Sequence, residues 1–261
     1  MATPAPLNEK LAIVTGGGRG IGRATALALA ARGADLVLLG RTERNVKKTA
    51  IDIRNQSDVT VHARALDVTD GDAVERTFQA LIDELGPPAI LVNNAGGAES
   101  APFAALDRDN WDTTLAVNLT SVYACTHAVL PAMIEAGYGR IINIASTAGL
   151  EGYPYVAAYC AAKHGVVGLT RSLALEVERK GITVNAVCPG YTDTEMLQAA
   201  IRKIAATTGR SEADARDELA AANAGGRLVQ PEEVAEMVAA LCGLAAKTVT
   251  GQALDLRGED S

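Results

Sequence analysis

A glycine-rich segment near the start of the chain, TGGGRGIG at residues 15–22, has the composition of a phosphate-binding turn. Glycine adopts positive φ angles without steric cost and lets the backbone approach a bound group closely. The segment follows a short apolar run typical of a strand and precedes a helical pattern, and the free N–H groups at a helix start attract phosphate. Tight strand-to-helix turns need glycine in any case, and the spacing here is G-x-x-x-G-x-G rather than G-x-G-x-x-G. We therefore predict a site for a dinucleotide pyrophosphate mainly because the segment lies between a strand and a helix.

The residues after the second predicted strand indicate which dinucleotide would bind. A site for NAD places Asp or Glu about 20 residues after the turn, where the carboxylate accepts hydrogen bonds from the ribose. Here Arg41 and Thr42 follow the strand, and Arg19 of the first turn is expected to converge on them. Because guanidinium groups bind phosphate in bidentate fashion, the pattern favours NADPH, which carries a 2′-phosphate. Glu43 is nearby, and we expect it to begin the next helix.

Four residues in the middle of the chain have types that take part in catalysis. Tyr159 and Lys163 are four apart in a helical pattern, so their side chains share one helix face. Ser146 follows the fifth predicted strand, and Asn118 lies in an apolar helical segment at 108–136. Each has an ordinary structural alternative: an amphipathic helix for the pair, a strand end for Ser146 and a packing amide for Asn118. Their joint occurrence after a dinucleotide turn favours a catalytic site.

Short apolar runs alternate with helical patterns along the chain, which is typical of a doubly wound sheet. The runs are mostly continuous, as in parallel strands that are covered on both faces. They lie at 11–15, 35–39, 61–65, 89–93, 140–145, 182–187 and 252–256. Helical patterns lie at 21–32, 42–55, 70–85, 108–136, 157–179 and 231–244. We therefore predict an α/β, Rossmann-type single domain over residues 1–261, with about seven parallel strands and helices on both faces.

One segment, residues 193–226, departs from this alternation. It is charged and helix-prone, and it follows a strand end, where the loops of an open α/β sheet build the site. A helical excursion at this place predicts a lid over the substrate, with Gly225-Gly226 as a hinge. A solvated surface insertion is the alternative.

The composition excludes several classes of protein. Of the 261 residues, 48% are hydrophobic, which is enough for a buried core and too many for a disordered chain. A net charge of −7 argues against nucleic-acid binding, which needs clustered positive charge. The four cysteines are widely spaced without a metal-ligand pattern, so we expect packed, reduced thiols and no metal. We see neither a secretory signal at the N-terminus nor an uninterrupted apolar stretch near ~18–20 residues, so we expect a cytoplasmic protein without membrane contact.

Taken together, the motifs resemble those of the short-chain dehydrogenase/reductase family. The matching motifs, in chain order, are Thr15-x-x-x-Gly20-x-Gly22, Asn93-Asn94-Ala95-Gly96, Asn118, Ser146, Tyr159-x-x-x-Lys163 and Pro189-Gly190. The resemblance extends from Lys10 to about Arg257, essentially the whole chain. Within the family, the segment AAKHGVVGLTRSLALEVERKGITVNAVCPG is similar to 3-oxoacyl reductases and to ketoreductases of aromatic polyketide synthesis.

The resemblance implies a catalytic role for each of the four residues. Tyr159 would give its phenolic proton to a carbonyl oxygen as hydride reaches the carbon. Because a free phenol titrates near pH ~10, Lys163 and the oxidised nicotinamide would both have to lower the pKa of Tyr159. Lys163 would also hold the nicotinamide ribose, and Ser146 would place the substrate carbonyl. Asn118 would anchor a water that connects Lys163 to solvent, and no metal is needed.

The resemblance also implies cofactor contacts outside this group. Asp67 would contact the adenine, and Asn94 is expected to hold the sheet and helix 108–136 in register. After Pro189-Gly190, the Thr192 backbone and the Thr194 hydroxyl would meet the nicotinamide carboxamide and a phosphate. The full set of predicted cofactor-binding residues is Thr15, Gly16, Gly18, Arg19, Gly20, Ile21, Gly22, Arg41, Thr42, Asp67, Val68, Asn94, Ala95, Gly96, Tyr159, Lys163, Pro189, Gly190, Thr192 and Thr194.

The substrate side of the site is less specific in sequence. The residues that we predict to contact the substrate are Ser146, Tyr153, Tyr155 and Tyr191. Either Tyr153 or Tyr155 is expected to line the pocket, with packing on a neighbouring subunit as the alternative. Cys160 and His164 are expected to point away from the helix face that carries Tyr159 and Lys163.

We predict NADPH-dependent reduction of a ketone, a 3-oxoacyl thioester or polyketide-like ketone, to a secondary alcohol. Relatives that act on acyl carrier protein carry basic residues where residues 133–138 of this chain have Glu135 and no base. An acidic carrier would gain little steering there, so coenzyme A esters and free ketones stay open. One alternative is an NADP-linked alcohol or cyclic-ketone dehydrogenase, and another is a non-catalytic dinucleotide sensor or scaffold. The apolar helices 108–136 and 157–179 predict a homotetramer or dimer.

Overall fold

A single parallel sheet organises the protein. The computed structural model describes residues 7–258; the expectation of no secretory signal also rests on residues 1–6, which lie outside the described residues. The strands within the described part are β1 (Leu11–Thr15), β2 (Asp35–Gly40), β3 (Val61–Ala65), β4 (Ile90–Asn93), β5 (Gly139–Ile144), β6 (Ile182–Pro189) and β7 (Ala253–Leu256). They pair in parallel in the order β3-β2-β1-β4-β5-β6-β7. The predicted Rossmann-type fold is confirmed, and every predicted strand is present within two residues of its expected bounds.

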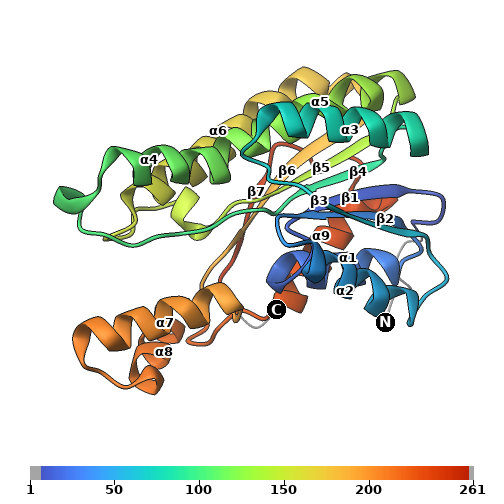
Figure 1. The fold of residues 1–261 in the computed structure, drawn as a ribbon. Coiled ribbons are helices and arrows are strands. Elements are labelled where there is room, and N and C mark those ends of the chain that lie inside the picture. Colours follow the sequence, from blue (N-terminus) through green and yellow to red (C-terminus); the bar gives the residue numbers. More distant parts are fainter. Residues whose placement is uncertain (1–6, 259–261) are drawn as a thin grey trace.

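Helices cover both faces of the sheet (Figure 1). On one face lie α1 (Gly20–Ala30), α2 (Glu43–Arg54) and α9 (Pro231–Cys242). On the other lie α3 (Gly71–Leu85), α4 (Arg108–Leu115), α5 (Ser121–Ala136) and α6 (Ala157–Val177). The strand order reverses between β1 and β4, and in open α/β sheets ligands bind at the carboxyl ends of the strands beside such a reversal.

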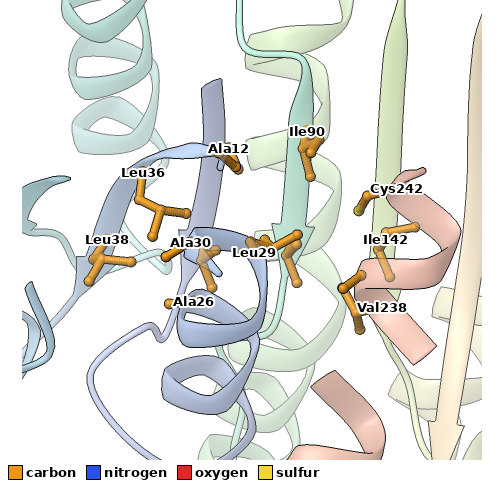
Figure 2. Close-up of a cluster of buried hydrophobic side chains, with 14 of the residues drawn as sticks. Ala12, Ala26, Leu29, Ala30, Leu36, Leu38, Ile90, Ile142, Val238 and Cys242 are labelled. Atoms are coloured by element: carbon orange, nitrogen blue, oxygen red, sulfur yellow. The ribbon is translucent and has the colours of Figure 1, made fainter. Parts of the chain in front are cut away.

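The core under α1 and α9 is built from small and aliphatic side chains. Figure 2 shows Leu29 of α1 and Val238 of α9 directed toward Ile90 and Ile142 of the sheet, and all four side chains are fully buried. Ala26 lies on the buried side of α1, where a short side chain lets neighbouring helices approach closely. An aliphatic core of this kind accounts for a chain in which only 3% of residues are aromatic.

The predicted helix 108–136 contains a local irregularity that the sequence pattern did not indicate. Between α4 and α5 the backbone forms one π-helical turn, Ala116–Thr120, with Asn118 buried inside it. Such turns are rare and often occur at functional sites.

The same stretch bears on the expectation of no membrane span. An 18-residue window within Arg108–Ala136 has a mean hydropathy of 1.3, so the stretch is long and apolar enough to cross a membrane by length and composition alone. The expectation concerned an uninterrupted apolar stretch, and polar residues such as Asn118 and His127 interrupt this one, although its average hydropathy reaches the range of a membrane span. In this fold the stretch packs against α3, α6 and the sheet, and 39% of its most apolar part is buried inside the protein. Buried core helices of soluble proteins pass the same test, so this finding alone does not indicate a membrane span.

The segment 193–226 forms two helices that lie beyond the carboxyl ends of the strands, α7 (Glu195–Thr208) and α8 (Glu212–Ala221) (Figure 1). The Thr194 side chain caps α7 by accepting a hydrogen bond from the backbone N–H of Leu197. Gly226 has φ +65°, and the Gly225 N–H donates to the carbonyl of Arg257. The base of the two-helix segment is thus tied to the residues that follow β7.

Candidate active site

The predicted site residues come together at one edge of the sheet. The glycine-rich turn follows β1, Asn94 follows β4, Ser146 follows β5, and Pro189 ends β6. Because parallel strands present their carboxyl ends at the same edge, these segments converge although they are far apart in sequence.

The glycine-rich turn is as closely packed as a phosphate-binding turn requires. Gly16 and Gly20 have φ angles of +67° and +49°, a region that side chains rarely adopt. A Cβ at Gly22 would lie 2.3 Å from the carbonyl oxygen of Gly16, so only glycine fits there. Helix α1 begins at Gly20, which leaves its first N–H groups directed toward the site.

Asn94 joins this turn to the neighbouring strand. Its side-chain NH₂ donates to the carbonyl oxygens of Thr15 (3.0 Å) and Gly16 (3.3 Å). The Thr15 hydroxyl accepts hydrogen bonds from the backbone N–H groups of Asn94 and Ala95 (3.0 and 3.1 Å). Asn94 therefore holds the turn, and the expectation that it connects the sheet to helix 108–136 was wrong.

The connection to the helix is made by Asn93 instead. Its side-chain NH₂ donates to Thr126 Oγ1 on α5 and to Asn143 Oδ1 on β5, each at 2.9 Å. Asn143 in turn donates to Thr170 Oγ1 on α6. All four side chains are buried. Successive strand residues face opposite sides of a sheet, so an error of one position assigned the role to the wrong asparagine. The available signal was that Asn93 and Asn143 lie opposite each other on the neighbouring strands β4 and β5.

A hollow of about 340 Å³ lies beside the end of β2. It is lined by residues that include Arg41, Leu66, Asp67 and Asp70. A backbone hydrogen bond from Thr69 lowers the pKa of Asp67, with a smaller lowering from the positive charge of Arg41. Arg41 and Asp67 were predicted to contact the cofactor separately, and the structure places them on one concave surface.

The three other residues predicted around the second strand lie nearby. Thr42 and Arg19 are exposed, and Arg19 is not among the residues that line the hollow. Within residues 7–258, neither the Arg19 nor the Arg41 guanidinium makes an ion pair, so both are available to an anionic ligand. Glu43 begins α2 as expected and pairs with Lys47 one turn later.

Tyr159 and Lys163 share one face of α6, as the spacing predicted. The Lys163 ammonium lies 5.5 Å from the centroid of the Tyr159 ring and donates to the carbonyl oxygen of Ile144, at the end of β5, at 2.7 Å. The Ser146 hydroxyl is a hydrogen-bond partner of the Tyr159 phenol and accepts from the N–H of Ala148. The strand end and the helix thus bring a serine, a phenol and an amine into one group.

Burial dominates the electrostatics of this group. It raises the pKa of Tyr159 to about 12, against a smaller lowering by the hydrogen bond with Ser146. It lowers the pKa of Lys163 to about 8. We expected the Lys163 ammonium to lower the pKa of the phenol; in the chain without cofactor the net shift has the opposite sign, because desolvation disfavours both charged forms.

Asn118 holds the loop after β4 close to Lys163. Its side-chain NH₂ donates to the carbonyls of Gly97 (2.8 Å) and Thr114 (2.9 Å), and its oxygen accepts from the N–H of Gly97 (3.1 Å). A Cβ at Gly96 would lie 2.9 Å from the Asn118 oxygen and 3.9 Å from the Lys163 nitrogen. Glycine therefore keeps this space open, and the water-anchoring role of Asn118 stays a prediction.

The predicted substrate tyrosines separate into two groups. Tyr153 and Tyr191 are half-buried and pack edge to face, with ring centroids 6.2 Å apart. Tyr155 is 65% exposed, with φ +67°. The half-buried Cys160 sulfur lies 4.0 Å from the Tyr153 carbonyl, whereas the His164 side chain is exposed. Tyr153 and Tyr191 therefore form one aromatic wall, and the Tyr153 carbonyl lies against the residue that follows Tyr159.

The segment after β6 is held by a residue that the sequence did not single out. The buried Asn223 accepts from the N–H of Tyr191 and donates to the Tyr191 and Arg227 carbonyls, at 2.7–2.9 Å. A Cβ at Gly190 would lie 2.3 Å from the Asn223 oxygen, so glycine is required there. The Thr194 methyl lies 3.2 Å from the position of a Cβ on Gly20, which places the start of α7 against the glycine-rich turn.

Across the described residues there is no cluster of three or more His, Cys, Asp or Glu side chains suited to a metal ion. The four cysteines are free thiols, as expected.

Comparison with known proteins identifies the family. The profile of the short chain dehydrogenase family matches residues 10–205. The chain therefore belongs to the short-chain dehydrogenases, a family of oxidoreductases, and the resemblance stated from the motifs is confirmed.

Individual relatives cover nearly the whole chain. A provisionally named ketoacyl reductase of Streptomyces coelicolor is 41% identical over 97% of this chain and 98% of its own. The crystal structure of a variant of actinorhodin polyketide ketoreductase with NADPH matches with a TM-score of 0.91 at 41% identity, over 99% of this chain and 98% of that one. The crystal structure of levodione reductase matches with the same TM-score at 32% identity, over 96% and 97% of the two chains.

The shifted pKa of Lys163 predicts a pH dependence of stability. Below pH 8 both the folded and unfolded states hold the proton, and the folded state carries the cost of burying the charge. Between pH 8 and the ordinary pKa of 10.5, the unfolded state binds more protons than the folded state, so the free energy of unfolding rises with pH. Over that range we expect the wild-type chain to gain about 3 kcal/mol relative to Lys163→Met. Urea unfolding of both chains without cofactor measures this difference, and a difference that does not change with pH contradicts it.

Proposed function

We propose that the chain is an NADPH-dependent ketoreductase that converts a ketone to a secondary alcohol. The observation that carries the proposal is the convergence of Ser146, Tyr159 and Lys163 beside the glycine-rich turn at the reversal of strand order. The likeness to proteins named as ketoacyl and polyketide ketoreductases supports the same reaction. Retention of all three residues argues against a non-catalytic dinucleotide sensor or scaffold.

The chain has the features that a dinucleotide needs. In the turn around Gly16, Gly20 and Gly22 the backbone can approach a pyrophosphate closely, because no side chain stands in the way. The hollow beside Arg41 and Asp67 could hold part of a nucleoside. Bound NADPH would supply hydride to the substrate carbon. The related polyketide ketoreductase whose structure contains NADPH supports this choice of cofactor.

The residues of the chain would provide positioning and the proton. Ser146 orients the carbonyl oxygen, and Tyr159 donates its phenolic proton to that oxygen as negative charge develops. A pKa raised to about 12 keeps Tyr159 protonated at neutral pH, the form that a general acid needs. Lys163, held by the Ile144 carbonyl, stabilises the phenolate that remains after the transfer and binds ribose hydroxyls.

Arg41 and Thr42 would select NADPH over NADH, because the chain carries no acid at the tip of β2. An exposed guanidinium beside the hollow is placed to bind a 2′-phosphate through charge-assisted hydrogen bonds. Arg19 would contribute a second positive charge from the start of α1.

Two substrate classes have specific support. A 3-oxoacyl thioester or polyketide-like ketone follows from the relatives named ketoacyl and polyketide ketoreductases. A cyclic ketone follows from the likeness to levodione reductase. Reduction of acetoacetyl-coenzyme A and of a cyclic dione, followed by NADPH absorbance, distinguishes the two classes.

We further propose that α7 and α8 act as a substrate lid and that the chain forms a homotetramer or dimer. The lid lies next to the Tyr153–Tyr191 wall and contacts the loop after β4 through a hydrogen bond from Lys203 to the Ser100 carbonyl. The second proposal rests on large apolar side chains exposed on α5 and α6, where Tyr123 is 54% and Leu175 is 79% exposed.

Replacing Tyr159 tests the reaction. We expect Tyr159→Phe to lower kcat for ketone reduction by about 10²- to 10⁴-fold, because the general acid is lost. The KM for NADPH should stay within about threefold of wild type. Tyr123→Phe, an exposed tyrosine outside the site, is the matched control and should retain full activity. Wild-type turnover by Tyr159→Phe would contradict the mechanism.

Replacing Arg41 tests the cofactor preference. Loss of charge-assisted hydrogen bonds predicts that Arg41→Ala raises the KM for NADPH by roughly 10- to 100-fold and leaves the KM for NADH almost unchanged. Lys48→Ala on α2 removes an exposed positive charge nearby and serves as the control. Equal effects on the two cofactors would contradict selection of the 2′-phosphate by Arg41.

Sedimentation measures the proposed assembly. At micromolar concentration we expect wild-type chain to sediment as a tetramer or dimer, and Leu175→Glu to sediment as a smaller species, because a charge would be buried in the apolar contact. A wild-type monomer would contradict the proposal. Ile51→Glu changes an exposed apolar side chain on α2 and is expected to leave the assembly unchanged.

A further inference from the structure

A chain of polar contacts connects the residues after β7 to the catalytic edge of the sheet. Arg257 Nη1 donates to Glu151 Oε1 at 2.7 Å. The same carboxylate oxygen lies 3.0 Å from the Tyr153 hydroxyl, which also lies 3.0 Å from the Thr147 hydroxyl. Thr147 directly follows Ser146 and is buried. The contacts therefore span 110 positions of sequence and end next to the proposed site of the carbonyl.

The chemistry of the groups determines which donates. A carboxylate only accepts, and a phenol has one proton, so Tyr153 donates to Glu151 and the Thr147 hydroxyl donates to Tyr153. Arg257 donates to the carboxylate from the other side. The hydroxyl protons of Tyr153 and Thr147 then each have an acceptor, and this arrangement holds the Tyr153 hydroxyl from two directions.

The far end of the chain of contacts is anchored. Arg257 Nε donates to both carboxylate oxygens of Asp255, at 2.8 and 3.0 Å, and Asp255 belongs to β7. The Arg257 carbonyl accepts from the N–H of Gly225, at the base of the lid segment. Glu151 is therefore held by a guanidinium that the sheet itself orients.

At the other end of this chain of contacts, Tyr153 and Tyr191 form the aromatic wall proposed for the substrate site. The Tyr153 ring meets the Tyr191 ring at 89°, and Asn223 holds the Tyr191 backbone on both its N–H and its carbonyl. The Tyr153 hydroxyl contacts Thr147, the neighbour of Ser146, and the Tyr153 carbonyl lies 4.0 Å from the sulfur of Cys160, the neighbour of Tyr159. A rotation of the Tyr153 ring would therefore move it relative to the segments that carry Ser146 and Tyr159, while Tyr191 stays in place.

We propose that Arg257 and Glu151 are positioning residues that hold Tyr153 against Tyr191 and thereby limit the size of the ketone that reaches Ser146 and Tyr159. This inference rests on the proposed ketoreductase function. Neither Arg257 nor Glu151 touches the reacting atoms; both act through the orientation of Tyr153. Because Glu151 is exposed, its loss is expected to change the orientation of the ring rather than the stability of the fold.

The first experiment measures the Tyr153 ring without any turnover. Chain labelled with 3-fluorotyrosine gives a ¹⁹F resonance for Tyr153, identified as the one missing from Tyr153→Phe. We expect Glu151→Ala and Arg257→Met each to shift this resonance, and Arg257→Lys to keep it closer to wild type because an ion pair is retained. An unshifted resonance in both Glu151→Ala and Arg257→Met overturns the proposal.

The second experiment measures selectivity with two 3-oxo esters that differ in size at the ketone. We compare kcat/KM for ethyl acetoacetate with that for ethyl benzoylacetate. The loss of one hydrogen bond predicts that Glu151→Ala and Arg257→Met lower this ratio two- to tenfold. The change should occur in KM for the larger ester, with kcat and the KM for NADPH within twofold. The double variant should match the single variants, because the residues act through one contact. An unchanged ratio overturns the proposal even if the resonance shifts.

The control is Arg32→Met. Arg32 pairs with Glu236 and joins the end of α1 to α9, at the opposite edge of the sheet from Tyr153. The substitution Arg32→Met removes an Arg–Glu contact of the same kind, so we expect it to leave both the Tyr153 resonance and the ester ratio unchanged. If Arg32→Met changes them as much as Arg257→Met does, the changes come from a general loosening of the fold, and the proposal is overturned. If wild-type chain reduces neither ester nor any other ketone, the proposed function fails, and the ¹⁹F result alone decides whether Arg257 and Glu151 hold Tyr153.

Discussion

The structure depends on the hydrogen bonds that hold the ends of β1 and β4 together. At a reversal of strand order the two following loops diverge toward opposite faces of the sheet, which leaves backbone groups without strand partners. Thr15 and Asn94 satisfy these groups with four hydrogen bonds across 78 to 80 positions of sequence. The glycine-rich turn then needs no side chains of its own to keep its shape, so its N–H groups remain directed toward a ligand.

A second constraint is the burial of ionisable groups. Tyr159 and Lys163 occupy a place where desolvation raises the pKa of the phenol and lowers that of the amine. Both shifts favour the neutral forms. The shift of Lys163 lowers the stability of the folded chain at neutral pH, where the buried amine is charged, whereas the Tyr159 phenol is neutral at that pH in the folded and the unfolded state alike. The lysine keeps one strong partner, the Ile144 carbonyl, at the end of the strand that also positions Ser146. The fold thus accepts a loss of stability at the point where proton transfer is proposed.

The fold and the centre of the site were predictable because their signals are local. Continuous apolar runs predicted most of the strands, glycine spacing predicted the turn, and a four-residue interval placed Tyr159 and Lys163 on one helix face. Long-range contacts had no such signal. The error over Asn94 and Asn93 arose because one position reverses the face of a strand. Asn223 gave no pattern at all, since its partners are backbone atoms 32 positions away and four positions away.

The positions of the few aromatic residues suggest what the tyrosines do in this protein. The core is filled by aliphatic side chains, so a tyrosine is free to serve where a rigid ring with a polar end is useful. Tyr159 would use its hydroxyl for proton transfer, whereas Tyr153 uses its hydroxyl to bind Glu151 and leaves its ring to meet Tyr191. These two tasks need opposite surroundings. Tyr159 has to be buried, because burial keeps its phenol protonated, whereas Tyr153 has to lie at the edge of the site, where its hydroxyl can reach a surface carboxylate. The five residues between the two tyrosines span that change, from the exposed Glu151 side of the loop to the buried face of α6.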